Sequence, residues 1–252
     1  MARVAVVTGG TRGIGKAIVE RLKADGLKVA AGYSGNEEAA QATAKEFGVM
    51  VVKGNVGSFE DCVRAVKEVE AELGPVDVLV NNAGITRDGT MHKMSFEQWN
   101  AVIQTNLASC FNMCRCVIES MRANKFGRIV NIGSIHSLVA SPYKSAYVAA
   151  KHGLLGFSKV LALETADTDI TINTICPTYV KTPLVDKQIA DQARTRGIPE
   201  AQVVREVMLK PMPKGVFIGF DELAGIAAFL ISPPARNITG HTIEVDGGWT
   251  VQ

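Results

Sequence analysis

V-A-V-V-T-G-G-T-R-G-I-G, residues 4–15, joins a short apolar run to a glycine turn and to the start of a helical pattern. The run V-A-V-V-T is typical of a buried strand, and Ile14, Ile18 and Leu22 predict a helix that ends near Gly26. Glycine lets the backbone approach a ligand, and the free amides at the start of a helix attract anions. The stretch therefore predicts a phosphate-binding turn in an α/β fold, although a tight turn without any ligand would have the same composition.

The alternation of apolar runs and helical segments continues along the whole chain. Further strands are predicted at residues 27–33, 49–53, 76–80, 128–132, 170–175 and 241–245. Strands that alternate with helices of about ten or more residues form a parallel sheet covered on both faces. We therefore predict a single domain over residues 1–252, an α/β doubly wound, Rossmann-like fold with a seven-stranded parallel sheet. A polar segment after the sixth strand, at about residues 184–217, predicts a lid over the edge of that sheet.

Two helix starts are predicted from capping signals. Ser95 with Gln98 forms a capping-box pattern before a long helix that reaches about Asn124. Ser141 followed by Pro142 predicts a second helix start, because serine caps free amides and proline suits the first helical position.

The bulk composition restricts the class of protein. The chain has 252 residues, 47% of them apolar and 21% charged, with a net charge of +2, so no nucleic-acid or membrane partner is indicated. No apolar run reaches the ~20 residues that span a bilayer, and no signal-peptide pattern precedes the first strand. We therefore expect a cytoplasmic protein. The cysteines lack a second ligand pair at zinc-site spacing, so buried thiols and no metal are expected at Cys62, Cys110, Cys114, Cys116 and Cys176.

A stripe of polar residues beyond the fifth strand indicates acid–base chemistry. Lys144, Tyr147 and Lys151 lie at i, i+3 and i+7, so a helix would place all three on one face. Positive charge on both sides of a phenol stabilises its ionised form, which suits a group that gives and takes a proton. Ser134 follows the strand at 128–132 and would reach the same edge of the sheet. A helix with a solvated tyrosine and two surface lysines is the alternative.

Four of these motifs fall at the same edge of the predicted sheet. Gly9, Asn82, Ser134 and Pro177 each follow a predicted strand, and ligands of such sheets bind beyond the carboxyl ends of the strands. The convergence predicts a dinucleotide site there.

The end of the second strand usually distinguishes between the two nicotinamide dinucleotides. A carboxylate at that point bonds a ribose 2′-hydroxyl and excludes a 2′-phosphate, but this chain has no carboxylate before Glu37. Arg12 in the glycine turn is a possible phosphate partner, or else a solvated loop charge. The sequence therefore does not distinguish between NAD and NADP as the cofactor.

The motifs T-G-G-T-R-G-I-G, N-N-A-G, the serine after the fifth strand and Y-x-x-x-K resemble the short-chain dehydrogenase/reductase family over essentially the whole chain. The resemblance implies that Tyr147 is the general acid and base and that Lys151 holds the nicotinamide ribose and stabilises the tyrosinate. It further implies that Ser134 bonds the substrate oxygen and that Asn106 supports a water relay behind Lys151.

The resemblance also implies a cofactor site, formed by the glycine turn and the later strand ends. Its residues would be Gly9, Thr11, Arg12, Gly13, Ile14, Gly15, Tyr33, Asn55, Val56, Asn82, Ala83, Gly84, Tyr147, Lys151, Pro177, Val180 and Thr182. A homotetramer is the assembly it implies.

The two halves of the chain resemble different subfamilies. A-A-G-Y-S-G-N and N-N-A-G-I-T-R-D-G-T resemble acetoacetyl-CoA reductases, whereas the chain from Ser134 onward resembles D-3-hydroxybutyrate dehydrogenases. In the latter a histidine, a lysine and two glutamines hold the substrate carboxylate, and His136, Lys144 and Gln188 match three of them. The fourth position is Thr86, so one hydrogen bond is missing. Tyr179 is a further substrate-binding residue in this interpretation.

Three functions follow from these observations. The first is reversible oxidation of a short D-3-hydroxy acid, most simply 3-hydroxybutyrate to acetoacetate, with Lys144 and His136 neutralising the carboxylate. The second is reduction of acetoacetyl-CoA by NADPH, in which the substrate is a thioester without that charge. The third is a nucleotide-binding regulatory protein without chemistry, although such a protein would be expected to lack one of Ser134, Tyr147 and Lys151.

Overall fold

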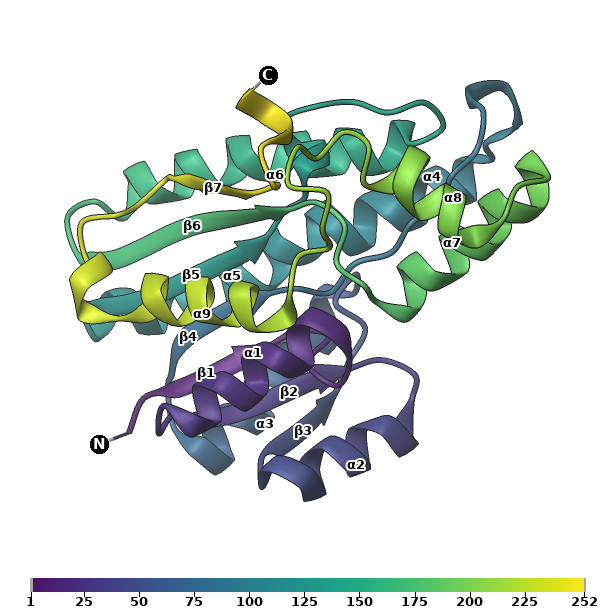
Figure 1. Cartoon of the computed structure of the whole chain (residues 1–252). Helices are drawn as coiled ribbons and strands as arrows, with labels where there is room; N and C mark the ends of the chain where they lie inside the picture. The colour runs from purple at the N-terminus through teal and green to yellow at the C-terminus, as the bar shows by residue number, and fades with distance from the viewer. Residues whose placement is uncertain (1, 252) are drawn as a thin grey trace.

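The computed structural model describes residues 2–251, and of residues 183 and 184 it describes only the backbone. Within that range seven strands form one parallel sheet in the order β3-β2-β1-β4-β5-β6-β7, as Figure 1 shows. The strands are β1 Val4–Val7, β2 Lys28–Tyr33, β3 Met50–Lys53, β4 Val76–Asn81, β5 Phe126–Ile132, β6 Asp169–Pro177 and β7 Thr242–Val245. Since β1 pairs with both β2 and β4, the strand order reverses between β1 and β4, and the predicted doubly wound fold is confirmed.

Helices cover both faces of this sheet. They are α1 Gly13–Ala24, α2 Glu37–Phe47, α3 Phe59–Leu73, α4 Phe96–Ile103, α5 Ser109–Ala123, α6 Ser145–Glu164, α7 Pro183–Arg196, α8 Glu200–Val203 and α9 Phe220–Ile231. The shorter turns are η1 Met91–Lys93, η2 Gln104–Ala108, η3 Ile135–Ser137, η4 Val204–Met208, η5 Pro233–Ala235 and η6 Trp249–Val251. In the core, α1, α2 and α9 share one hydrophobic cluster with the strands, and α3, α5 and α6 share another.

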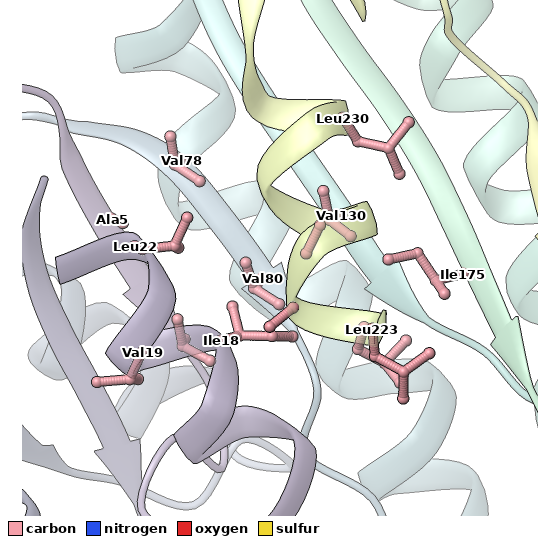
Figure 2. Packing of buried hydrophobic residues seen from close by; sticks show 14 of the residues in the cluster. Ala5, Ile18, Val19, Leu22, Val78, Val80, Val130, Ile175, Leu223 and Leu230 are labelled. Carbon is pink, nitrogen blue, oxygen red and sulfur yellow. The ribbon is translucent and has the colours of Figure 1, made fainter. Parts of the chain in front are cut away.

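Alternate residues of each strand supply these two clusters, because successive side chains of a strand point to opposite faces. Ala5 of β1 lies in the first cluster and its neighbour Val6 in the second. Figure 2 shows part of the first cluster, in which Ile18 of α1 lies beside Val80 of β4 and Leu223 of α9 packs on the same face of the sheet. Helices therefore pack against both faces of the sheet, and the carboxyl ends of its strands form a rigid edge at which a site can lie.

The long helix predicted from Ser95 is present, but it is interrupted. Ser95 and Gln98 form the predicted capping box, with Gln98 N donating to Ser95 Oγ at 3.2 Å and Ser95 N donating to Gln98 Oε1 at 3.0 Å. The π-helical turn η2 separates α4 from α5 and carries Asn106. Such turns are often found at functional positions.

The helix start predicted at Ser141 is wrong. Helix α6 begins at Ser145, and Tyr143 has a φ of 72°, which no α-helix can include. The Ser141 hydroxyl lies 2.9 Å from Nε2 of His136, so it bonds a histidine ring in place of free helical amides. Lys144 is consequently the residue that precedes the helix, one turn before Tyr147.

The insertion predicted after the sixth strand is largely helical. Figure 1 shows α7 and α8 in green, beyond the carboxyl ends of the strands. They share a small hydrophobic cluster of their own, in which Val185, Ile189, Val203 and Met208 are buried. A parallel bridge between Val180 and Ile218 joins the two ends of the insertion.

In the described part of the chain, no helix combines the length and the apolar character needed to cross a membrane. All the cysteines in residues 2–251 are free thiols. Burial raises the pKa of the Cys62 thiol to about 12, which keeps this group protonated and unreactive near neutral pH.

Candidate active site

The glycine turn adopts a conformation that only glycine accepts easily. Gly9 and Gly13 have φ values of 63° and 53°. A Cβ atom on Gly15 would lie 2.3 Å from the Gly9 carbonyl oxygen and 2.4 Å from Nδ2 of Asn82. The turn thus packs against the start of α1 and the end of β4 with no room for a side chain.

The start of α1 is open to an anion. Arg12 is the N-cap residue of α1, and its side chain makes no capping hydrogen bond. Within the described residues, the first amides of α1 therefore have no side-chain acceptor. At Gly13 a Cβ atom would meet only Cγ2 of Thr182, at 3.7 Å. Free amides, the positive end of the helix dipole and a backbone without side chains fit the pyrophosphate of a dinucleotide.

Asn82, predicted in the cofactor site, ties the turn after β1 to the end of β4. Its Nδ2 donates to the carbonyl oxygens of Thr8 at 2.9 Å and Gly9 at 3.1 Å. The Thr8 hydroxyl accepts from the backbone N–H groups of Asn82 at 3.0 Å and Ala83 at 3.1 Å. Thr8 is not among the predicted site residues, although its place directly before the two glycines was a usable signal.

Asn106 holds the chain that follows β4. From the π-helical turn η2, its buried side chain accepts from Ile85 N at 2.9 Å and donates to Ile85 O at 2.8 Å. Gly84 lies so close that a Cβ atom there would be 2.8 Å from Oδ1 of Asn106. Asn106 therefore positions the loop after β4 at the edge of the sheet, and the water relay stays a prediction.

Tyr147 lies between two ammonium groups, as the sequence predicts. The Nζ atoms of Lys144 and Lys151 are 5.8 and 5.7 Å from the centre of its ring. Lys151 is only 5% exposed and donates to the carbonyl oxygen of Ile132 at 2.7 Å, its one hydrogen bond among the described residues. An ammonium group has three donors, so this buried cation has donors to spare, which fits the hydroxyls of a ribose.

Ser134 and His136 form a short network after β5. The Ser134 hydroxyl accepts from His136 N at 3.2 Å and lies 3.4 Å from Nδ1 of the ring, while Nε2 lies 2.9 Å from Ser141 Oγ. Burial lowers the pKa of His136 to about 4, and the charge of Lys144 contributes to this lowering. Burial therefore favours the neutral form of the histidine near pH 7, and its part in neutralising a substrate carboxylate stays a prediction. It can still take part in a hydrogen bond.

Aromatic rings surround this network. The ring of His136 lies edge-on to Tyr147 at 6.0 Å and to Trp249 at 6.3 Å, and Trp249 stacks on Tyr179 at 6.2 Å. Tyr179, predicted to bind substrate, is thus joined to the catalytic candidates through Trp249. Trp249 is not among the predicted site residues, and its place after the last strand, in G-G-W, was the available signal.

Lys144 is not a free cation. It forms an ion pair with Asp88 in the loop after β4, and the two side chains are 16% and 33% exposed. A backbone hydrogen bond of 2.8 Å from Gly89 N to Tyr143 O holds the two loops together. Gln188 is half-buried on α7, and its side chain has no hydrogen bond within the described residues.

The residues predicted around the adenosine half of the cofactor lie at the ends of β2 and β3. Asn55 Oδ1 accepts from Gly57 N at 3.0 Å, and Asn112 donates to the carbonyl oxygen of Val56 at 3.0 Å, so both positions are fixed locally. Tyr33 donates to Glu37 at 2.8 Å. This hydrogen bond lowers the pKa of the Glu37 carboxyl, which is consequently ionised near the end of β2.

The remaining cofactor candidates follow β6. Pro177 ends this strand beside Val245 of β7, and Val180 is buried where the insertion begins. Thr182 caps α7 by accepting from Val185 N at 3.3 Å. A Cβ atom added to Gly13 would be 3.7 Å from Cγ2 of Thr182, so the start of the insertion lies over the glycine turn.

Comparison with known proteins agrees with this geometry. The family model described as short chain dehydrogenase matches residues 3–193. The chain belongs to the short chain dehydrogenase family. It is accordingly an oxidoreductase that uses a nicotinamide cofactor, as the resemblance of its motifs implied.

Several relatives of this short chain dehydrogenase cover its full length. It is 50% identical to an acetoacetyl-CoA reductase of Shinella zoogloeoides, with 98% of each chain covered. It is 43% identical to a D-beta-hydroxybutyrate dehydrogenase of Rhizobium meliloti, with 100% of each chain covered. A crystal structure of a variant actinorhodin polyketide ketoreductase with NADPH is 34% identical, has a TM-score of 0.94 and covers 98% of this chain and 97% of its own. Both subfamilies seen in the motifs are thus represented among the relatives.

Proposed function

We propose that this short chain dehydrogenase interconverts a short D-3-hydroxy acid and its 3-keto acid, with D-3-hydroxybutyrate and acetoacetate as the substrates. The observation that carries the proposal is Tyr147 between two ammonium groups, beside the network of Ser134 and His136. The names of the relatives support the same pair of four-carbon acyl groups, as free acid or as thioester.

Each of the catalytic side chains has a separate role in the proposed reaction. When bound, the nicotinamide supplies or accepts the hydride. Tyr147 gives a proton to the carbonyl oxygen during reduction and takes it from the hydroxyl during oxidation. Lys151 stabilises the tyrosinate by its charge, and Ser134 donates a hydrogen bond to the same substrate oxygen.

The substrate carboxylate would lie on the side of Tyr147 that faces Lys144. Lys144 would bind it by charge, whereas the neutral His136 and Gln188 would add hydrogen bonds. Residues 184–217 would act as a lid that excludes water from this contact. Asp169, which pairs with Arg128 at the opposite end of β6, takes no part in this chemistry.

Reduction of acetoacetyl-CoA is the second candidate. The ion pair between Lys144 and Asp88 favours it, because a thioester needs no free cation at Lys144. The side chain of Arg12 also has no ion pair or hydrogen bond among the described residues, which leaves its guanidinium available to a 2′-phosphate. Glu37 is already engaged by Tyr33 and lies 3.6 Å from Lys53. We therefore propose that NADP is accepted alongside NAD.

We also propose that the protein is a cytoplasmic homotetramer. Free thiols suit a reducing compartment. Large apolar side chains are exposed on α5 at Phe111, which is 54% exposed, and on α6 at Leu163, which is 79% exposed. These helices cover one face of the sheet and would pack against a second copy. Light scattering on the purified chain should give four times the monomer mass, and a monomer mass would reject the assembly.

Steady-state kinetics with two substrates and two cofactors tests the function. We expect turnover of acetoacetate and 3-hydroxybutyrate, and a Lys144→Ala variant should raise the KM of the free acids by at least about tenfold, because a charge-assisted contact is lost. Reduction of acetoacetyl-CoA alone, with no free-acid turnover, would reject the first candidate and support the second.

A further inference from the structure

The loop after β4 brings a carboxylate to the cation that the free-acid substrate needs. Asp88 is 56 positions away from Lys144 in the sequence, yet the two side chains form a direct ion pair. A backbone hydrogen bond of 2.8 Å from Gly89 N to Tyr143 O joins the two loops that carry this pair, next to the paired side chains. The contact is therefore built into the loops and does not depend on two long side chains meeting by chance.

The carboxylate of Asp88 lies close enough to two predicted substrate-binding residues for its charge to act on them. Its negative charge acts on His136, where it opposes the lowering of the pKa that burial and Lys144 cause. Burial is the main cause that raises the pKa of Tyr179, and the charge of Asp88 adds to it. Asp88 thus acts electrostatically on the histidine and the tyrosine that, with Lys144, are predicted to contact the substrate.

A carboxylate substrate and Asp88 must compete for one ammonium group. Lys151 is buried and engaged with Ile132, and His136 is neutral near pH 7, so Lys144 is the cation left for a substrate carboxylate beside Tyr147. Binding a free acid there displaces Asp88 or places two carboxylates against one cation. A thioester has no charge at this position and leaves the pair intact.

We infer that Asp88 determines specificity: by occupying Lys144 it weakens the binding of free 3-keto and 3-hydroxy acids relative to their thioesters. The inference rests on the proposed function, because that function places the carboxylate or thioester end of the substrate on the side of Tyr147 that faces Lys144. Asp88 touches no reacting atom in this scheme, so it acts on KM and leaves kcat largely unchanged.

An Asp88→Asn variant tests the inference, since it keeps the shape of the side chain and removes its charge. We expect the KM of acetoacetate to fall about tenfold, which corresponds to ~1.4 kcal/mol, with less than a threefold change for acetoacetyl-CoA. An Asp88→Asn, Lys144→Ala double variant should lose this gain. As a matched control, Asp25→Asn removes a carboxylate from the ion pair with Arg21 on α1 and should leave both KM values unchanged.

A binding measurement separates this inference from the proposed function. Calorimetry with acetoacetate and oxidised cofactor, which cannot react together, should show about tenfold tighter acetoacetate binding by Asp88→Asn. If neither protein reduces acetoacetate but the variant binds it more tightly, the role of Asp88 stands and the free-acid function fails. If the wild type reduces acetoacetate and the variant gains neither affinity nor a lower KM, the role of Asp88 is overturned and the function stands.

Discussion

Replacing Tyr147 by phenylalanine should lower kcat by a factor of about 10²–10⁴, the usual contribution of a general acid or base. The ring would remain between Lys144 and Lys151 and edge-on to His136 at the 6.0 Å seen here, so the packing of the site should survive. Only the exchangeable proton would be lost. Stopped-flow or steady-state turnover of the best substrate, together with cofactor binding by fluorescence, measures both effects.

The neighbouring tyrosine provides the control for this variant. Tyr143 is 63% exposed and carries the same chemical group four positions earlier, outside the stripe of Tyr147 and Lys151. A Tyr143→Phe variant should therefore keep wild-type turnover. A Tyr147→Phe variant that retains more than a tenth of the wild-type kcat would show that another group transfers the proton.

Replacing Gly15 by alanine should weaken cofactor binding by at least about tenfold and destabilise the fold by ~1–3 kcal/mol, the usual cost of overpacking. The added Cβ atom would lie 2.3 Å from the Gly9 carbonyl oxygen, which is backbone and cannot move aside without opening the turn. Nδ2 of Asn82, 2.4 Å away, is itself fixed by hydrogen bonds to Thr8 and Gly9. Fluorescence titration with NADH and NADPH and a thermal melt measure the two losses.

A glycine in another helix provides the control that separates an effect on packing from an effect on cofactor binding. At Gly225 of α9 a Cβ atom would meet only the far end of Arg21, at 3.9 Å, so Gly225→Ala should be tolerated and should gain helix propensity of up to ~1 kcal/mol. Its cofactor affinity should equal that of the wild type. Unchanged affinity in the Gly15→Ala variant as well would mean that the glycine turn does not bind the cofactor.

Several local predictions were confirmed because they depend on neighbours in the chain. The strand, glycine turn and helix at residues 4–26 are set by short-range patterns, and so is the capping box of Ser95 and Gln98. The start of α6 was predicted wrongly. Ser141 and Pro142 carry a helix-start signal, but the serine hydroxyl is bound to His136, and Tyr143 takes a left-handed conformation.

The sequence by itself determined the parallel sheet, the edge at which the candidate site lies and the spacing that sets Tyr147 one turn from Lys151, because periodicity and residue type suffice for these features. Only the tertiary structure decided that Lys144 is paired with Asp88, that burial lowers the pKa of His136 and that Trp249 lies beside this histidine. These three facts depend on how loops from β4, β5 and β7 meet. Contacts between these loops depend on the positions of the strand ends in space, and no local sequence pattern predicts those positions.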